Sequence, residues 1–154
     1  MNVEILKEKP PGRISRVILG ATREQGGTRA RRIQVGGGTG LPFHFFESEA
    51  GPRPVVAMEV YDKVPPKFPE ALRQHFSDVL ARPHEMARRC VEQFGAEMIS
   101  LRLEGTHPEK GNRSAGEAAE TVRAVLASVD VPLMITGHSH FEKNNEVLKK
   151  ACEA

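Results

Sequence analysis

The sequence predicts an α/β fold: a partial TIM (β/α) barrel of about three parallel β/α units, preceded by an N-terminal β-hairpin extension. Three segments carry this prediction, because each is an apolar run that turns polar at its end and leads through a loop into a helix. They read PVVAMEVYD (54–62), MISLRLEGTHP (98–108) and VPLMITGHSH (131–140). Polar groups at the C-terminal ends of parallel strands are typical of barrel proteins. Three units cannot close an eight-stranded barrel, so we expect an incomplete one.

Composition bounds the function classes. The chain has 154 residues, 39% of them hydrophobic and 27% charged, as expected for a globular domain. A net charge of +2 and an aromatic fraction of 5% without Trp argue against nucleic acid as a partner. No apolar run of roughly 18 residues and no N-terminal signal is present, which predicts no membrane association and a cytoplasmic protein. Cys90 and Cys152 are expected to be free, buried thiols.

Residues 1–50 are predicted to form the extension. Two short strands within 13–20 and 31–35 are separated by a turn-rich Glu-Gln-Gly-Gly segment, which indicates a hairpin. The following Gly36 to Gly40 reads GGGTG and lacks the Lys and Ser/Thr of a phosphate-binding P-loop, so it is interpreted as a turn. Leu41 to Phe46 supplies an apolar patch. We expect the extension to pack on one end of the sheet.

Residues 51–154 are predicted to hold the first three β/α units. The first strand spans 55–60, and a helix carrying Leu72, Phe76, Val79 and Leu80 follows at helical spacing. Pro83 begins the next helix, with Met86, Ala87, Cys90, Val91 and Phe94 as its apolar residues, and Gly95 ends it. The second strand spans 98–104. Its helix begins with a capping box of Ser114 and Glu117. The third strand spans 131–136, and the last helix starts near Asn144. An open doubly wound sheet would also fit this order.

The two faces of the strands favour the barrel. Because side chains alternate along a strand, one row is apolar and is expected to pack against the helices: Val56, Met58, Val60, Ile99, Leu101, Leu103, Leu133 and Ile135. The opposite row becomes polar toward the barrel mouth: Glu59, Arg102, Glu104, Thr136 and His138. An open sheet covered on both sides would show continuous apolar runs instead. A plainer interpretation is that Glu59 and Arg102 only neutralise each other in the lumen.

Two loops carry further candidates. Gly137-His138-Ser139-His140 contains a His-x-His pair of the kind that binds metal in barrel hydrolases, although the additional ligands such enzymes place on later strands are missing. The loop from Thr106 to Arg113 is polar and lies between a strand and a helix, where functional residues are frequent. It is equally well interpreted as a solvated turn.

Several of these segments resemble one known family. AMEVYD (57–62), EMARRCVEQFGAEMISLRLEGTHPEKGNRS (85–114), VPLMITGHSHFEKNNEVLKKACEA (131–154) and VGGGTGLPFHFFE (35–47) are similar to the delta subunits of the acetyl-CoA decarbonylase/synthase complex. The same family includes the small subunit of the corrinoid iron–sulfur protein. The resemblance implies members about twice as long that complete the barrel, so the chain would correspond to the N-terminal half.

The resemblance also implies a function in acetyl-CoA metabolism, through the Wood–Ljungdahl pathway of carbon fixation or through methanogenesis. Together with a large corrinoid iron–sulfur subunit, such a protein holds a corrinoid whose cobalt takes a methyl group from a methyl-pterin. The methyl group passes to the nickel centre that forms acetyl-CoA. Acetyl-CoA synthase and a methyl-pterin methyltransferase are the other implied partners. The chain itself would be non-catalytic and bind no metal directly. A polar barrel mouth is compatible with this role, and the candidates for corrinoid binding, chosen by their position there, are Thr106, His107, Gly137, His138 and Ser139.

Two alternatives stay open at this point. An independent pterin-dependent methyltransferase would use Glu59 and Glu104 among the carboxylates that hold a pterin ring. A metal-dependent barrel hydrolase would use His138 and His140 as ligands.

Overall fold

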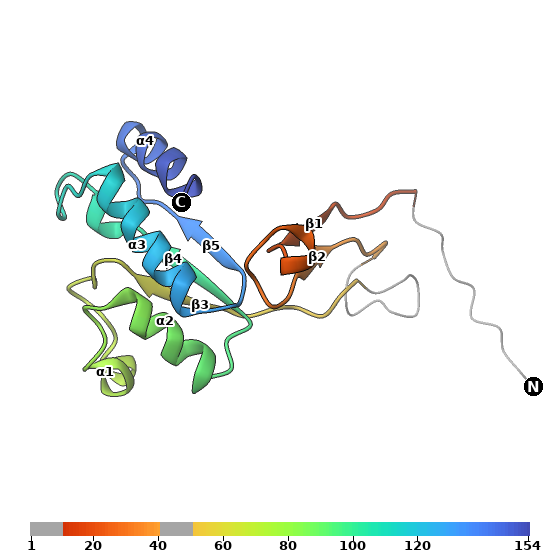
Figure 1. Cartoon of the computed structure of the whole chain (residues 1–154), viewed down its shortest axis with the longest axis horizontal. Helices are drawn as coiled ribbons and strands as arrows, with labels where there is room; N and C mark the ends of the chain where they lie inside the picture. The colour runs from red at the N-terminus through yellow and green to blue at the C-terminus, as the bar shows by residue number, and fades with distance from the viewer. Residues whose placement is uncertain (1–10, 41–50) are drawn as a thin grey trace, which may run out of the picture.

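A computed structural model describes residues 11–40 and 51–154 of the chain. It contains a two-stranded antiparallel sheet and a three-stranded parallel sheet with helices on it (Figure 1). The antiparallel pair lies beside the ends at which the parallel strands begin (Figure 1). The apolar patch predicted for 41–46 lies outside the described residues.

The N-terminal hairpin is confirmed. Strand β1 (Arg16–Leu19) pairs antiparallel with β2 (Ile33–Gly36). The short 3-10 turn η1 (Arg23–Gln25) lies between them and ends at Gly26, whose φ of 77° is left-handed. Gly36 and the residue after it, Gly37, also have positive φ angles of 74° and 86°. Glycine adopts this conformation without the steric cost of a Cβ atom, so the GGGTG segment ends β2 at Gly36 and leaves the strand through Gly37.

The three predicted units form one parallel sheet in the order β3 (Ala57–Tyr61), β4 (Met98–Arg102) and β5 (Leu133–Thr136). The register sets Tyr61 opposite Arg102, and Arg102 opposite Thr136. The C-terminal ends of the strands therefore meet at one edge. The described strands do not close on themselves, so the sheet and its parallel order are confirmed while the barrel remains a prediction.

Helices cover one face of the parallel sheet. They are α1 (Glu70–Phe76), α2 (Pro83–Glu92), α3 (Ala115–Ser128) and α4 (Phe141–Cys152). The side chains of Ile99, Leu101 and Leu103 are fully buried beneath them, as the alternation predicts. The capping box is also confirmed, because the Ser114 hydroxyl accepts from the Glu117 N–H at 3.2 Å. Among the described helices, none combines the length and apolar character that crossing a bilayer requires.

Several predictions for the helix-facing row and the helices are wrong. Val56 is 73% exposed because it precedes β3, where the sheet does not yet shelter it. Leu72, in α1, and Phe94, two residues beyond the end of α2, are each 46% exposed. Cys152 is exposed, whereas Cys90 is buried as expected, and burial raises the pKa of its thiol to about 11.

Several element boundaries also differ from the predictions, among them the starts of β3 and β5, which lie two residues later than predicted. Helix α1 ends at Phe76, so the buried Val79 and Leu80 belong to the turn that follows it. The strand predicted to reach 104 ends at Arg102, and the short 3-10 turn η2 (Glu104–Thr106) follows. Helix α4 begins at Phe141 rather than near Asn144, because the His140 ring caps its first turn.

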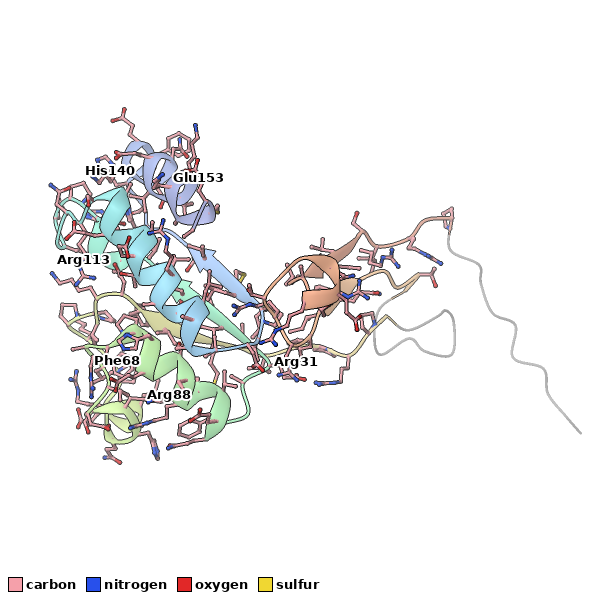
Figure 2. The ribbon with its side chains drawn as sticks, viewed as in Figure 1. Arg31, Phe68, Arg88, Arg113, His140 and Glu153 are labelled. Carbon is pink, nitrogen blue, oxygen red and sulfur yellow. The ribbon has the colours of Figure 1, made fainter. Side chains whose placement is uncertain are left out.

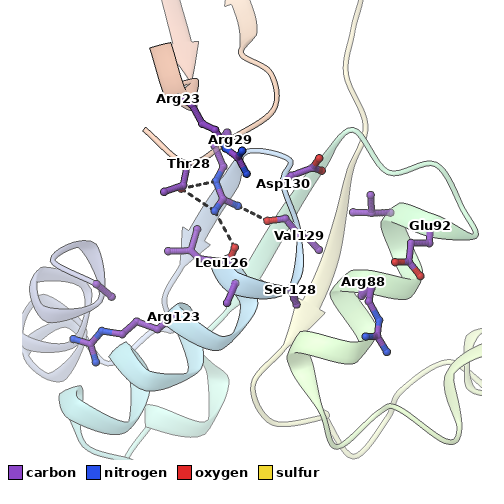
Figure 3. A pocket seen from close by; sticks show the side chains of 13 residues that line it. Arg23, Thr28, Arg29, Arg88, Glu92, Arg123, Leu126, Ser128, Val129 and Asp130 are labelled. Atoms are coloured by element: carbon purple, nitrogen blue, oxygen red, sulfur yellow. Dashed lines mark hydrogen bonds between the residues drawn. The ribbon is translucent and has the colours of Figure 1, made fainter. Parts of the chain in front are cut away.

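One arginine joins the hairpin to the parallel layer. Arg29 is only 8% exposed, and its Nη1 donates to the Val129 carbonyl at 2.6 Å while its Nη2 donates to the Leu126 carbonyl at 2.8 Å (Figure 3). The neighbouring Ala30 N–H donates to the Asp130 carbonyl at 2.8 Å. These carbonyls lie at the C-terminal end of α3, where backbone acceptors lack partners and a positive charge is favourable. In the described residues 11–40, the extension therefore packs against the end of α3 and the loop that leads into β5.

Replacing Arg29 with Ala is expected to lower the free energy of unfolding by about 2–3 kcal/mol, because buried carbonyl groups lose a charged donor. Urea unfolding followed by circular dichroism measures this change. The matched control is Arg123→Ala, in helix α3, whose C-terminal end Arg29 contacts. Arg123 is exposed and forms an ion pair with the exposed Glu120, so its loss is expected to change stability by less than about 0.5 kcal/mol. Equal stability of both variants would contradict the assigned role of Arg29.

Candidate functional site

Polar side chains gather where β3, β4 and β5 end. Figure 2 shows Arg113 and His140 at this end of the molecule, far from Arg31 beside the hairpin. A cavity of about 700 Å³ lies at the hairpin end instead, where Arg29 docks (Figure 3). Since that arginine is engaged with backbone carbonyls, we place the candidate site at the C-terminal ends of the strands.

The first part of the site is a charged network across β3 and β4. The Tyr61 hydroxyl donates to Glu59 Oε2 at 2.5 Å, and the Arg102 Nη1 atom lies 3.6 Å from Glu59 Oε1. Arg102 Nε also donates to Glu104 Oε2 at 3.2 Å, and Lys110 donates to the other oxygen of Glu104. The predicted pairing of Glu59 with Arg102 is confirmed. The structure adds that Glu104 is shared between two cations.

These contacts make the site polar but nearly balanced in charge. The hydrogen bond from Lys110 lowers the pKa of Glu104, which keeps the carboxylate ionised at neutral pH. The hydrogen bond to Glu59 raises the pKa of Tyr61, which keeps the phenol protonated. Two carboxylates thus oppose two cations. A cavity of about 240 Å³ beside this network is lined by Lys63, Val64, Pro65, Pro66, Glu104, Glu109 and Lys110.

The second part is a cluster of three imidazole rings, which we call the histidine cluster: His107, His138 and His140. The centroid of the His107 ring lies 5.0 Å from that of His138 and 6.1 Å from that of His140. His107 follows β4 and the other two follow β5, so the loops after two neighbouring strands meet. Burial lowers the pKa of His138, and the neighbouring His107 lowers it further.

A metal site is not formed by this cluster. Within residues 11–40 and 51–154, no group of three or more His, Cys, Asp or Glu side chains is arranged to hold a metal ion. Each ring of the cluster instead accepts a backbone N–H through its Nδ1 atom, at 3.2 Å for His107, 3.1 Å for His138 and 3.4 Å for His140.

Asp62 is a site residue that the sequence analysis missed. Its side chain is 1% exposed, and Oδ1 accepts the Gly105 N–H at 2.8 Å, which fastens η2 to the end of β3. Arg113 Nη1 lies 3.7 Å from Oδ2 and donates to the Asp62 carbonyl at 3.1 Å. Burial raises the pKa of this carboxyl group. The position of Asp62 directly after the end of β3, comparable to that of Glu104 two residues after β4, is the signal that could have identified it.

The remaining predicted residues take different positions. Thr106 is fully buried and its hydroxyl donates to the Leu103 carbonyl at 2.8 Å, so its side chain faces the interior. The Thr136 hydroxyl donates to the Leu101 carbonyl at 3.4 Å. Gly137 lies against Asn144, leaving no room for a Cβ atom. Ser139 is exposed beside the histidine cluster. Of the five residues predicted near a cofactor, Ser139 is exposed and His138 is partly exposed, whereas His107 is buried beside them.

The fold and the site define the chain as an α/β protein of parallel strand–helix units with a polar, charge-balanced site at the C-terminal strand ends. A family model described as CO dehydrogenase/acetyl-CoA synthase delta subunit matches residues 16–154. The chain belongs to this family. The resemblance noted from the sequence is thereby confirmed.

Curated relatives carry the name acetyl-CoA decarbonylase/synthase complex subunit delta. The Archaeoglobus fulgidus protein is 40% identical over 150 residues, which cover 97% of this chain and 33% of the relative. The Methanothermobacter thermautotrophicus protein is 41% identical over 144 residues, covering 94% and 35%. The subunit delta 1 of Methanosarcina thermophila is 39% identical over 140 residues, covering 91% and 32%.

The chain therefore spans about a third of the length of these relatives. The prediction that family members are about twice as long is wrong.

The buried carboxyl group of Asp62 gives a pH prediction. Its pKa is raised from 3.8, so the folded state binds the proton more tightly than the unfolded state. The stability contributed by Asp62 must then fall as pH rises from 3.8 through the folded pKa, and stay level above it. The stability of Asp62→Asn relative to the parent is expected to rise over the same window.

Urea unfolding of both proteins measures this difference. It is followed between about pH 3.5 and pH 7, the range in which carboxyl groups titrate. The exposed Glu92→Gln variant is the control. A difference between Asp62→Asn and the parent that does not change with pH would show that the carboxyl group is not desolvated.

Proposed function

We propose that this chain is part of a subunit of an acetyl-CoA decarbonylase/synthase complex and that it helps a large corrinoid iron–sulfur subunit to hold a corrinoid. The observation that carries the proposal is the family match over residues 16–154, which includes every element of the site. Relatives that share 39% to 41% identity are named as subunits of that complex. In this proposal the partners include the acetyl-CoA synthase and the methyl-pterin methyltransferase components.

The residues of the site fit a corrinoid. The edge of a corrin ring carries uncharged amide groups, which need hydrogen-bond donors and acceptors rather than a strong local charge. The network of Glu59, Arg102, Glu104 and Lys110 supplies both kinds of group with little net charge. His107, His138 and Ser139 would lie on the same rim. The cobalt of a bound corrinoid supplies the methyl-carrying chemistry, and the protein supplies binding and orientation.

We also propose that the uncovered face of the parallel sheet is the inner face of a larger barrel. The side chains on this uncovered face include Glu59, Arg102, Met134 and Thr136. Met134 is 39% exposed. In the described part of the chain, β3 and β5 each pair on one side only, so both edges offer free backbone groups. Relatives about three times as long provide enough polypeptide for further units.

The two alternatives are less well supported. A pterin-dependent methyltransferase would need free carboxylates, whereas Glu59 and Glu104 are held in ion pairs with Arg102 and Lys110. A metal-dependent hydrolase would need ligands with free lone pairs, whereas the Nδ1 atoms of His138 and His140 already accept backbone N–H groups.

Co-expression with the large corrinoid iron–sulfur subunit tests the proposal. We expect the purified complex to retain corrinoid, measured by its visible absorption and by cobalt analysis, and the large subunit alone to retain less. Arg102→Met removes the centre of the charged network and is expected to lower corrinoid retention roughly tenfold, since it breaks more than one charged contact. Arg123→Ala, remote from the site, is the control and is expected to retain as much as the parent.

Three outcomes would contradict the proposal. They are corrinoid retention that does not depend on this chain, stoichiometric zinc in the purified protein, and tight binding of a methyl-pterin without any partner.

A further inference from the structure

The charged network leaves the histidine cluster unexplained. In each of its three rings, Nδ1 accepts a backbone N–H: from Glu109 to His107, from His140 to His138 and from Lys143 to His140. A nitrogen that accepts a hydrogen bond does not carry the proton, so each neutral ring must carry its proton on Nε2. The cluster therefore presents three N–H donors.

This arrangement has the opposite polarity to that of a metal site. A histidine that binds a metal through Nε2 usually donates its Nδ1–H to a carbonyl or carboxylate oxygen. Here each Nδ1 faces a donor, so binding a metal at Nε2 would require the ring to lose its backbone hydrogen bond. The His-x-His pattern at 138–140 thus has the spacing of a metal-binding pair, but its Nε2 atoms carry protons and are not free to bind a metal.

His138 Nε2 is the most informative of the three donors. The atom is enclosed, and no hydrogen-bond acceptor for it lies among the described residues. A buried donor without an acceptor is destabilising, so such groups usually have a further partner. The His107 ring lies edge-to-face with the His138 ring, at 5.0 Å between centroids, and the exposed Ser139 and His140 form the solvent side of the cluster.

The electrostatic surroundings do not favour a cation either. The ionisable groups that act on His138 are His107, Glu104 and Lys110 from the β4 side and His140 at the start of α4. Glu104 is already neutralised by Arg102 and Lys110, which leaves no free carboxylate from this set to attract a metal ion.

We infer that the histidine cluster is a hydrogen-bond donor site for an oxygen atom of a ligand, either an amide carbonyl or a phosphate oxygen. The inference rests on the proposed function only for the identity of that ligand, because corrinoids carry amide carbonyls and, in complete cobamides, one phosphate. His138 donates to the oxygen, and the rings of His107 and His140 lie beside it, with centroids 5.0 Å and 6.5 Å from that of His138.

Nuclear magnetic resonance of the chain labelled with ¹⁵N-histidine tests the donor assignment. At neutral pH, two-bond ¹H–¹⁵N spectra are expected to show the Nε2–H tautomer for all three rings of the cluster. His75 and His84, on α1 and α2, serve as internal references. An Nδ1–H tautomer at His138, or zinc binding at one equivalent that shifts all three rings, would overturn the inference.

Three probes then identify the oxygen source: inorganic phosphate, dicyanocobinamide, which has amides but no phosphate, and cyanocobalamin, which has both. Both axial positions of the cobalt are filled, by two cyanides in dicyanocobinamide and by cyanide and the benzimidazole base in cyanocobalamin, so an imidazole ring can bind the cobalt only by displacing one of these ligands. Shifts of the His138 Nε2 resonance by both corrinoids indicate an amide carbonyl. Shifts by phosphate and cyanocobalamin alone indicate a phosphate. No shift with any probe at millimolar concentration would overturn the inference.

Two substitutions separate donation from packing. His138→Leu removes the donor and is expected to weaken binding of the active probe roughly tenfold, as for one hydrogen bond to a polar or charged group. His138→Gln places an amide N–H near the Nε2 position and is expected to stay within about threefold of the parent. Equal weakening by both substitutions would contradict a donor role.

The outcomes also separate this inference from the proposed function. If His138→Leu leaves binding of the probe unchanged while the complex with the large subunit still retains corrinoid, the donor inference fails and the proposed function stands. If the donor behaviour is found but that complex retains no corrinoid, the proposed function fails and the donor site stands with another ligand.

Discussion

The alternation of side chains along β4 is the constraint on which the rest of the structure depends. Ile99 and Leu101, with Leu103 just after the strand, are fully buried beneath the helices, while Ser100 and Arg102 point to the opposite face. A shift of one residue in register would bury Arg102 and expose the apolar row. Because β4 is the central strand, its register also sets which residues of β3 and β5 stand beside Arg102 at the polar end.

The polar end combines rigidity with low net charge. Asp62 fastens the turn after β4 to the end of β3, and Arg113 contacts the same aspartate. Glu104 is held between Arg102 and Lys110, and each ring of the histidine cluster is fixed by a backbone N–H. Side chains that are fixed in this way present a prearranged surface, which reduces the ordering cost of binding a ligand. Such a surface is compatible with the proposed role of holding a large polar cofactor.

The sequence was sufficient for much of this account, and the failures have physical causes. Period-two alternation located all three parallel strands, and the Ser114–Glu117 pair located the start of α3, because these signals are local. Val56 and Leu72 were misplaced because exposure depends on where a sheet or neighbouring helix ends, which local pattern does not record. Lys110 was missed because its contact with Glu104 depends on the path of the loop.

In the candidate site too, the sequence predicts some features, while others depend on the path of a loop or the rotation of a side chain. The sequence placed His107 and His138 in loops after neighbouring strands, and the structure brings their rings to 5.0 Å. It also suggested Thr106 as a cofactor contact, but the turn η2 directs that side chain inward. Which ring nitrogen faces a backbone N–H depends on side-chain rotation, so the polarity of the histidine cluster could not be predicted from residue spacing.

The central claim is that the polar face and the edges of the parallel sheet belong to the interior of a larger assembly of strands. Hydrogen exchange followed by mass spectrometry tests it most directly, in the chain alone and in a chimera where the chain replaces its matched segment in the Archaeoglobus fulgidus relative. The account predicts that amides of β3 and β5 exchange at least roughly tenfold more slowly in the chimera, because partner strands pair with their free edges. Equal exchange of these amides in the two folded proteins would contradict it.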